Sequence, residues 1–385
     1  MTGPLPGIAS IVPRPSTDLA PLLAWLRTGR PTEQRLDFPA GTALPDGRLD
    51  LCKQQLGPDG AALVADAVAD AATGGSAPVR HLLLGTDGLG DAGAAAVADR
   101  TSGTGVETLY LGCNGITTTG ACRLADRLYA SPHVVRALWL KRNPLGPAGG
   151  PAAAELVRAA AELHTLDLVQ TGLDAAGLRA LADAVLASGR RFERLYLGGN
   201  PLGPDGAVQA ARLITAGVLD ELYIPAAGLG DAGADVLARA LAEAPPGRLR
   251  RLSAASSGLG PAAAARLVAA AAEAGVELLD LGRIRAAAVL TAADNRLDAT
   301  ATAAIAETLA GRAHGLRHLV LAGTGLRSRD ALPLLAGAER SPYATRYVLG
   351  KGVATTVRRR LDALAADVPA PVVPAAVAAV RSVHR

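Results

Sequence analysis

Aromatic residues and lysine are scarce in this chain of 385 residues. Phe, Trp and Tyr together number ten, and lysine occurs only at Lys53, Lys141 and Lys351. Half of the residues are apolar, yet no uncharged apolar run reaches the 18 or so residues that a membrane-spanning helix needs. The first residues lack a basic segment followed by an apolar core, which a secretory signal requires. We therefore expect no membrane association and a cytoplasmic location.

Cysteine and catalytic motifs are equally sparse. The three cysteines, Cys52, Cys113 and Cys122, show no metal-ligand spacing, and the six histidines are dispersed. No HExxH or GxSxG motif is present, so no residues for catalysis are visible and we expect neither enzyme activity nor a cofactor. The net charge of +4 is modest for this length and does not point to nucleic acid.

A repeated frame dominates what the sequence does contain. Residues Val135–Leu145 have an apolar residue, two variable residues, Leu, one variable, Leu, two variable, Asn, one variable and Leu; residues 106–116 and 192–202 share this frame. Its fourth position recurs at intervals of 27 to 30 residues, which indicates a stacked-repeat architecture. The recurring leucines are Leu82, Leu109, Leu138, Leu166, Leu195, Leu222, Leu252 and Leu279.

Each repeat unit changes its hydrophobic period halfway. Leu138-Trp139-Leu140 alternates with period two, which is typical of a half-buried strand, whereas Ala121, Leu124, Ala125 and Leu128 have helical spacing. Gly-Pro or Gly-Asp pairs stand between the halves, where a helix is expected to begin. One strand and one helix cannot bury their apolar faces alone, so neighbouring units must stack. Strands stack closer than helices, so we expect a parallel sheet inside a curve and helices outside.

This frame resembles the leucine-rich repeat family, and the 27–30-residue unit with a full outer helix resembles its ribonuclease-inhibitor-like class. The resemblance implies an α/β horseshoe-shaped solenoid of about ten repeats. It also implies that the frame asparagines form a buried ladder that bonds the backbone between turns. Thr171, Ala227, Ser257 and Thr324 depart from Asn at this position, and Ala254 replaces the second strand leucine. The scarcity of lysine, with abundant Arg, Ala, Gly and Pro, is associated with bacterial genomes of high GC content.

Three regions are expected. Residues 1–45 form an N-terminal segment with a capping helix, residues 46–350 the solenoid, and residues 351–385 a closing helix with a Pro-rich tail. In the eighth copy about ten extra residues delay the frame asparagine to Asn295, and we refer to residues 282–295 as the insertion. Such an insertion lies on the rim of a solenoid, where it serves either binding or only as a tolerated loop.

Four of the ten aromatics share the fifth frame position, where random placement would put about 0.3 of them. The two frame leucines of each strand point inward, so positions three, five and seven face solvent on the concave side. Exposed aromatics with interspersed charges resemble a binding hot spot, although they could also only pack along the sheet. The candidate binding residues are Tyr110, Trp139, Lys141, Arg142, Asp167, Gln170, Arg194, Tyr196, Glu221, Tyr223, Arg251, Asp280 and Arg283.

The leading functional hypothesis is a non-enzymatic scaffold that binds a protein or peptide in its concavity, which the resemblance also implies. A second hypothesis is GTPase regulation, because the family includes Ran GTPase-activating proteins, although no shared GTPase-contacting residues can be matched. Nucleic-acid binding through arginine and aromatics is a third, but Asp167, Glu221 and Asp280 interrupt the basic run. GxGxxG occurs at residues 88–93 and 228–233, but repetition marks these as turn glycines.

We expect all three cysteines to be reduced thiols, because they occupy different repeats and have no pairing logic. Thiol titration of the denatured, unreduced protein should give three equivalents. A single equivalent would indicate a disulfide and contradict this expectation.

Overall fold

The structure is a computed structural model that describes residues 11–73, 75 and 77–383. The first ten residues of the expected N-terminal segment and the last two residues of the tail lie outside the described residues. Internal contacts group the chain into two compact units. Unit 1 comprises Met1–Leu173 and Val373–Arg385, and unit 2 comprises Asp174–Val372.

Unit 1 begins with a short 3-10 helix and a helix, followed by an antiparallel strand pair and then alternating strands and helices. Strand β2 pairs antiparallel with β1 and β3, and strands β3 to β7 pair in parallel in chain order. The elements are η1 (Ser16–Leu19), α1 (Ala20–Arg27), β1 (Leu36–Phe38), β2 (Gly41–Ala43), β3 (Arg48–Asp50), α2 (Gly57–Thr73), β4 (His81–Leu83), α3 (Gly90–Arg100), β5 (Thr108–Tyr110), α4 (Thr118–Ala130), β6 (Ala137–Trp139), α5 (Gly149–Ala159), β7 (Thr165–Asp167) and α13 (Ala375–Ala378).

Unit 2 repeats the same alternation. Its strands β8 to β13 pair in parallel, again in chain order. The elements are α6 (Ala175–Ala187), β8 (Phe192–Tyr196), α7 (Gly203–Thr215), β9 (Leu219–Tyr223), α8 (Gly230–Glu243), β10 (Arg251–Ser253), α9 (Pro261–Glu273), β11 (Leu278–Asp280), α10 (Ala299–Gly311), β12 (His318–Val320), α11 (Ser328–Arg340), β13 (Arg346–Val348) and α12 (Thr355–Leu364).

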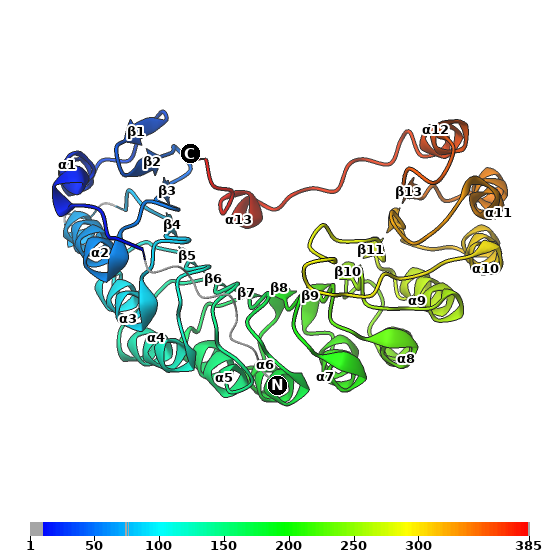
Figure 1. Ribbon diagram of the computed structural model, residues 1–385, viewed down its shortest axis with the longest axis horizontal. Coiled ribbons are helices and arrows are strands. Elements are labelled where there is room, and N and C mark those ends of the chain that lie inside the picture. Colours follow the sequence, from blue (N-terminus) through cyan, green and yellow to red (C-terminus); the bar gives the residue numbers. More distant parts are fainter. Residues whose placement is uncertain (1–10, 74, 76, 384–385) are drawn as a thin grey trace. The chain divides into compact units, whose positions relative to one another are not determined.

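The repeat frame sets the register of the strands. Leu82 pairs with Leu109 and Leu222 with Leu252, so the fourth frame position of each repeat lies beside that of the next. These leucines are fully buried between the sheet and the helices. In each unit the strands lie on the inner side and the helices that connect consecutive strands lie on the outer side; the short α13 is not one of these helices (Figure 1). This arrangement confirms the expected parallel strands inside and helices outside. None of the helices in the described part of the chain is long and apolar enough to span a membrane.

The helix starts differ in one respect from their expected role. Asp91 lies in the first turn of α3, as predicted, but its carboxylate accepts hydrogen bonds from the N–H and the hydroxyl of Thr117, both at 2.7 Å. Thr117 is the N-cap of α4. Asp231 in α8 likewise accepts from the N–H of Gly260, the N-cap of α9. Each aspartate therefore satisfies a donor at the start of the next repeat's helix, in addition to lying at the positive end of its own.

The eighth frame position adopts a left-handed backbone in most repeats. Thr86 has φ of 64° and Cys113 of 59°, and the glycines at this position, Gly199 and Gly323, have 70° and 83°. Such a conformation costs a non-glycine residue about 1–2 kcal/mol. It turns the chain out of the strand while the N–H of Thr86 still donates to the carbonyl of Gly112 in the next repeat, at 2.9 Å. The gain in pairing between repeats offsets the local strain.

The frame asparagines form a buried ladder, as the resemblance implied. The Asn143 carboxamide oxygen accepts from the N–H groups of Asn114 and Ile116, at 2.9 and 3.1 Å. Its nitrogen donates to the carbonyls of Leu111 and Leu140, both at 2.9 Å. Asn295 makes the equivalent four bonds in unit 2. Each amide thus satisfies backbone groups of two repeats that would otherwise be buried without partners.

Asp87 occupies a ladder position with a carboxylic acid. One carboxyl oxygen accepts from the N–H of Gln54 at 2.6 Å, while the other, Oδ2, is buried and has no hydrogen-bond partner among the described residues. At the equivalent position of the next repeat, the side-chain nitrogen of Asn114 donates a hydrogen bond to the carbonyl of Leu84. An ionised Asp87 has no proton with which to make the equivalent bond. Burial raises the pKa of Asp87 to about 7, although the N–H groups of residues 54–56 act in the opposite direction.

Asp87 should make the unfolding free energy fall as pH rises. Its folded-state pKa of about 7 exceeds the ordinary 3.8, so the folded protein keeps a proton that the unfolded chain releases across this window. We expect the unfolding free energy of Asp87→Asn, relative to that of the wild type, to increase by roughly 2–3 kcal/mol between about pH 5 and pH 8 in denaturant titrations. Asp59→Asn, which changes an exposed carboxylate on α2, is the control and should leave the wild-type profile unchanged. Parallel profiles for Asp87→Asn and wild type would show that Asp87 is ionised throughout.

Candidate binding face

The candidate residues occupy the strand positions that the buried leucines leave free. In unit 1, Tyr110, Trp139, Lys141 and Asp167 come from β5, β6 and β7 and from the residues that follow β6. We call these four residues the Tyr110 cluster. Arg142 is exposed and Gln170 is half-buried, and both lie in the left-handed turn after a strand, with φ of 57° and 54°.

Aromatic and cationic groups pack together in the Tyr110 cluster. The ring centroids of Tyr110 and Trp139 lie 6.2 Å apart, and the Lys141 ammonium lies 5.2 Å from the Tyr110 centroid. A side chain at Gly85 would place its Cβ 2.5 Å from the Tyr110 ring, so glycine there leaves room for that ring. Contact of this kind between a cation and an aromatic ring contributes about 0.5–1 kcal/mol at exposed sites and more when desolvated.

The buried carboxylate of Asp167 sets the charge balance of this cluster. Asp167 accepts from the N–H of Val169 at 2.8 Å and is only 3% exposed. Burial raises the pKa of Asp167 to about 6, opposed by that N–H and by the charge of Lys141. Burial also acts on Lys141, yet Tyr110 and Asp167 together raise the pKa of its ammonium group. At neutral pH the cluster therefore presents a cation and an anion side by side with two aromatic rings.

In unit 2, five candidate residues meet around Glu221 on β9. Its carboxylate lies 3.3 Å from the Arg194 guanidinium and 3.6 Å from that of Arg251. The Tyr223 hydroxyl donates to the same carboxylate at 2.8 Å, and the rings of Tyr196 and Tyr223 stack at 4.6 Å. We call this group the Glu221 cluster: Arg194, Tyr196, Glu221, Tyr223 and Arg251. Burial and the neighbouring Glu221 raise the pKa of Tyr223, so its phenol stays protonated.

The aromatics are less exposed than the sequence suggested. Trp139 is only 6% exposed, and Tyr110, Tyr196 and Tyr223 are half-buried. The expectation of freely exposed rings was therefore wrong for Trp139. The cause is the strand spacing of about 4.8 Å, which brings equivalent side chains of neighbouring repeats into contact. The alternative that the rings pack along the sheet agrees with these distances, but packing and binding are compatible, because binding anchors lie in well-packed surroundings.

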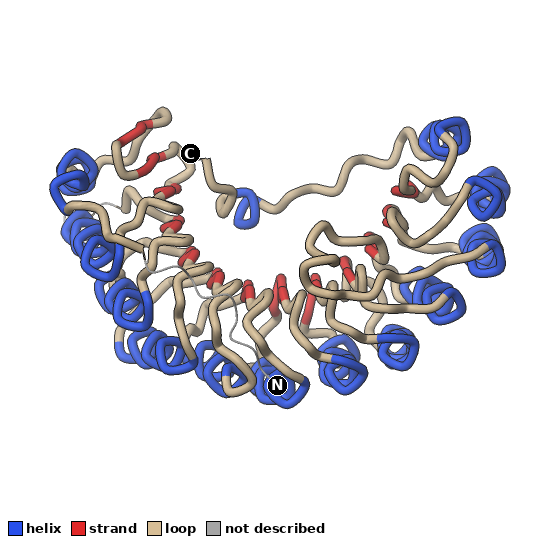
Figure 2. The backbone as a smooth tube through the Cα atoms, viewed as in Figure 1, coloured by secondary structure: helices blue, strands red, loops and turns tan. Residues whose placement is uncertain are grey.

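Asp280 and Arg283 lie at the start of the 282–295 insertion. Burial raises the pKa of Asp280, while the Gly282 N–H and the Ser253 hydroxyl act in the opposite direction. Arg283 is exposed and pairs with Asp294 at 3.0 Å, within the same insertion. Figure 2 shows the insertion as a loop between β11 and α10. Its backbone is held by a bond from the Ile284 N–H to the Ser256 hydroxyl at 3.0 Å.

Four further residues of the same face were not among the candidates. In the repeat frame, Arg48, His318 and Arg346 occupy the third position and Asp50 the fifth. All four form hydrogen bonds with residues 365–383, which we call the C-terminal segment. Their frame positions could have marked them, because positions three and five face away from the buried leucines in every repeat. Burial lowers the pKa of His318, although the backbone of Pro369 partly offsets this effect.

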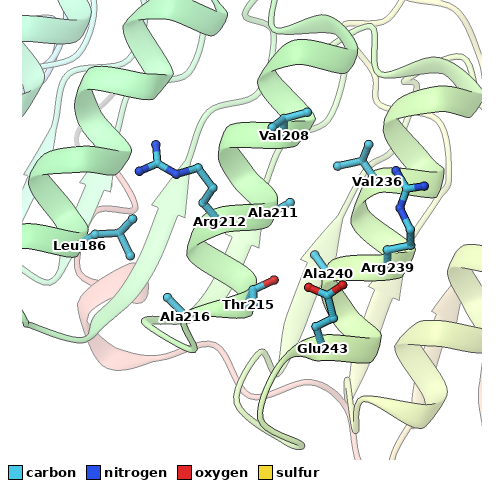
Figure 3. Close-up of a pocket in the computed structure, with 10 residues that line it drawn as sticks. All are labelled: Leu186, Val208, Ala211, Arg212, Thr215, Ala216, Val236, Arg239, Ala240 and Glu243. Carbon is cyan, nitrogen blue, oxygen red and sulfur yellow. The ribbon is translucent and has the colours of Figure 1, made fainter.

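The helical side offers a weaker candidate. A hollow of about 550 Å³ lies over α7 and α8 with Leu186 of α6 at its edge, and Figure 3 shows Val208, Arg212 and Arg239 around it. Val208 is 43% exposed, and Arg212 pairs with Asp183 at 2.7 Å on the helix surface. The strand face, with its buried charges and stacked rings, is therefore the stronger candidate.

Metal and thiol chemistry have little basis in the described residues. Among them no group of three or more His, Cys, Asp or Glu side chains could hold a metal ion. Cys52, Cys113 and Cys122 form no disulfide, and burial raises the pKa of the Cys52 thiol, which makes it a poor nucleophile.

Removal of Glu221 should destabilise the fold because it leaves the buried Arg194 charge and the Tyr223 hydroxyl without their shared acceptor. We expect Glu221→Ala to lower the unfolding free energy by about 3 kcal/mol in denaturant titrations. Glu193 pairs with the same arginine, but its side chain is 44% exposed, so Glu193→Ala should cost about 0.5 kcal/mol or less. Adding Arg194→Met to Glu221→Ala should recover part of the loss. An equal loss of unfolding free energy in the two glutamate variants would show that Glu221 is not the shared partner that stabilises this cluster.

No protein-family model matches the chain, and no curated protein matches it. Among solved structures, 86 chains are significantly similar. A leucine-rich repeat-containing protein of Legionella pneumophila, LegL7, aligns with a TM-score of 0.50 and 16% identity, covering 79% of this chain and 95% of that protein. A structure described as a TLR13–ssRNA13 complex aligns with a TM-score of 0.38 and 12% identity, covering 72% of this chain and 37% of that one.

The likeness to LegL7 extends over most of both chains and agrees with the arrangement seen in each unit: parallel strands inside, helices outside and a buried asparagine ladder. These observations show that the chain has the leucine-rich repeat fold.

Proposed function

We propose that the chain is a non-enzymatic scaffold that binds another protein or a peptide through the strand face of its repeats. The observation that carries this proposal is the composition of the Tyr110 and Glu221 clusters. They place Tyr, Trp and Arg on consecutive strands, at positions where the fold needs no large side chain. These three residue types dominate the energetics of protein interfaces.

The charge pattern favours a protein or peptide partner over a nucleic acid. Arg194 and Arg251 share the carboxylate of Glu221, and Asp167 adds a negative charge near Lys141. A nucleic acid requires a continuous positive surface for its phosphates, which these carboxylates interrupt. A protein partner that carries aromatic groups and charged groups of both signs can complement this mixed surface.

Small changes on this face should weaken binding while the fold persists. Affinity purification from the native cell supplies the partner, and calorimetry measures its affinity for each variant. We expect Tyr196→Ala and Trp139→Phe to weaken binding by about 2 kcal/mol, or roughly 30-fold, because each removes an anchor from the interface. Trp139→Phe retains an aromatic ring at the buried position, so the fold survives.

The matched control is Tyr129→Ala, which removes a tyrosine that is 81% exposed on the helical side. It should change neither the melting temperature nor the affinity. A folded Tyr196→Ala, Trp139→Phe double variant with wild-type affinity would place the binding surface elsewhere, with the 282–295 insertion next in line. Loss of binding in the control would point to the helical side instead.

A further inference from the structure

Residues 381–383 lie on the strand face of unit 1. The Arg48 guanidinium donates to the carbonyl of Arg381 at 2.8 Å. The Asp50 carboxylate accepts from the Ser382 hydroxyl at 2.9 Å and from the Val383 N–H at 2.6 Å. These residues are more than 330 positions apart in sequence. Arg48 and Asp50 are therefore a donor and an acceptor on one strand that hold a three-residue peptide stretch between them.

The two side chains hold mainly the backbone of this stretch. Arg48 bonds a carbonyl and Asp50 bonds the N–H two residues later, so only the Ser382 hydroxyl among the bonded groups belongs to a side chain. Asp50 is fully buried, and the Arg48 side chain is only 10% exposed and fixed by Asp46 at 2.7 Å. The pair is thus positioned in advance, which reduces the ordering cost of binding a peptide.

Unit 2 holds the preceding residues in the same manner. The Arg251 guanidinium donates to the carbonyl of Val372 at 2.8 Å, and that of Arg346 donates to the carbonyls of Ala365 and Val368 at 2.8 and 3.0 Å. These arginines occupy the same frame position as Arg48. Arginine donors at equivalent positions in both units therefore take backbone carbonyls, which is how a face recognises a peptide without reading its sequence.

The C-terminal segment buries little apolar surface. Val372 and Val373 are 73% and 53% exposed, whereas Val368 and Ala379 are its buried apolar anchors. Pro369 and Pro371 favour an extended backbone, which leaves a carbonyl such as that of Val372 available to bond a side chain of the face. A segment with so little buried apolar surface can detach without unfolding the repeats.

We infer that Arg48 and Asp50 form a backbone clamp for an unpaired peptide segment of a protein partner, and that residues 381–383 occupy this clamp in the free protein. The inference rests on the proposed function and deepens it, because it names one part of the face and the chemistry of its ligand. A helix does not fit the clamp, because its carbonyls are already bonded within the helix. Binding of the partner displaces the chain's own end, which competes as a tethered ligand at an effective concentration of about millimolar.

The test uses the full-length protein and a fluorescent synthetic peptide of residues 373–383 as the probe. Ser382→Ala with Val383→Pro removes both donors to Asp50 from the tethered segment and leaves the clamp intact. Ser382→Ala with Val383→Ala retains the Val383 N–H and is the matched control. Release of the segment is followed as the rate of tryptic cleavage after Arg381.

We expect the proline variant to be cleaved faster and to bind the probe at least tenfold more tightly than the wild type, because the clamp is then free in most molecules. The alanine control should bind less than threefold more tightly than the wild type. Arg48→Met added to the proline variant should abolish the gain, and the same peptide N-methylated at the Val383 position, which has no N–H for Asp50 to accept, serves to measure background binding.

Several results would overturn the inference: an unchanged cleavage rate in the proline variant, equal probe affinity for that variant and wild type, or full binding after Arg48→Met. Its failure is distinct from failure of the proposed function. A partner whose affinity depends on Trp139 and Tyr196, but is the same for wild type and the proline variant, leaves the proposed function standing. Probe binding at the clamp, with no partner sensitive to those aromatics, would leave the clamp but not the proposed aromatic surface.

Discussion

Hydrogen bonding of the buried turns is the constraint on which the rest of the structure depends. Each turn from strand to helix lies between two neighbouring turns and away from water, so its N–H and C=O groups need partners from the protein. Asn143 meets this need on two repeats because a carboxamide both donates and accepts. Thr324 only donates to its own turn, and Asp87 has no proton to donate when ionised. The residue at the ninth frame position therefore determines how many hydrogen bonds connect each repeat to its neighbour.

The face proposed to bind a partner results from the same stacking. Because the frame leucines fill the space between strands and helices, the remaining strand positions are free to vary in every repeat. Parallel register then brings equivalent positions of neighbouring repeats together, and aromatic rings and charges gather in rows. The Glu221 carboxylate is surrounded by two guanidinium groups and a phenol for this reason. Such a group is costly to bury singly but stable when each member has a partner.

Local patterns predicted the fold well and the face only in part. Leucine spacing defined the strands, because period-two alternation is a local pattern. The left-handed turn position was not predicted, since Thr86 and Cys113 carry no signal and only Gly199 and Gly323 hint at it. The burial of Trp139 depends on side chains of neighbouring strands. The contact of Asp50 with Val383 joins residues 333 positions apart in the sequence, and no local pattern encodes it.

The aspartates that bond the next helix have a consequence for recombining repeats. Asp91 belongs to one repeat, yet the donors it satisfies belong to Thr117 at the start of α4. A designer who excises or transplants a repeat at the strand boundary separates this acceptor from its donors and exposes a bare helix start. The exchangeable module is therefore offset from the strand–helix repeat: it runs from the aspartate in the first turn of one helix to the N-cap of the next helix. Chimeras cut in this phase retain a filled helix start at each new junction.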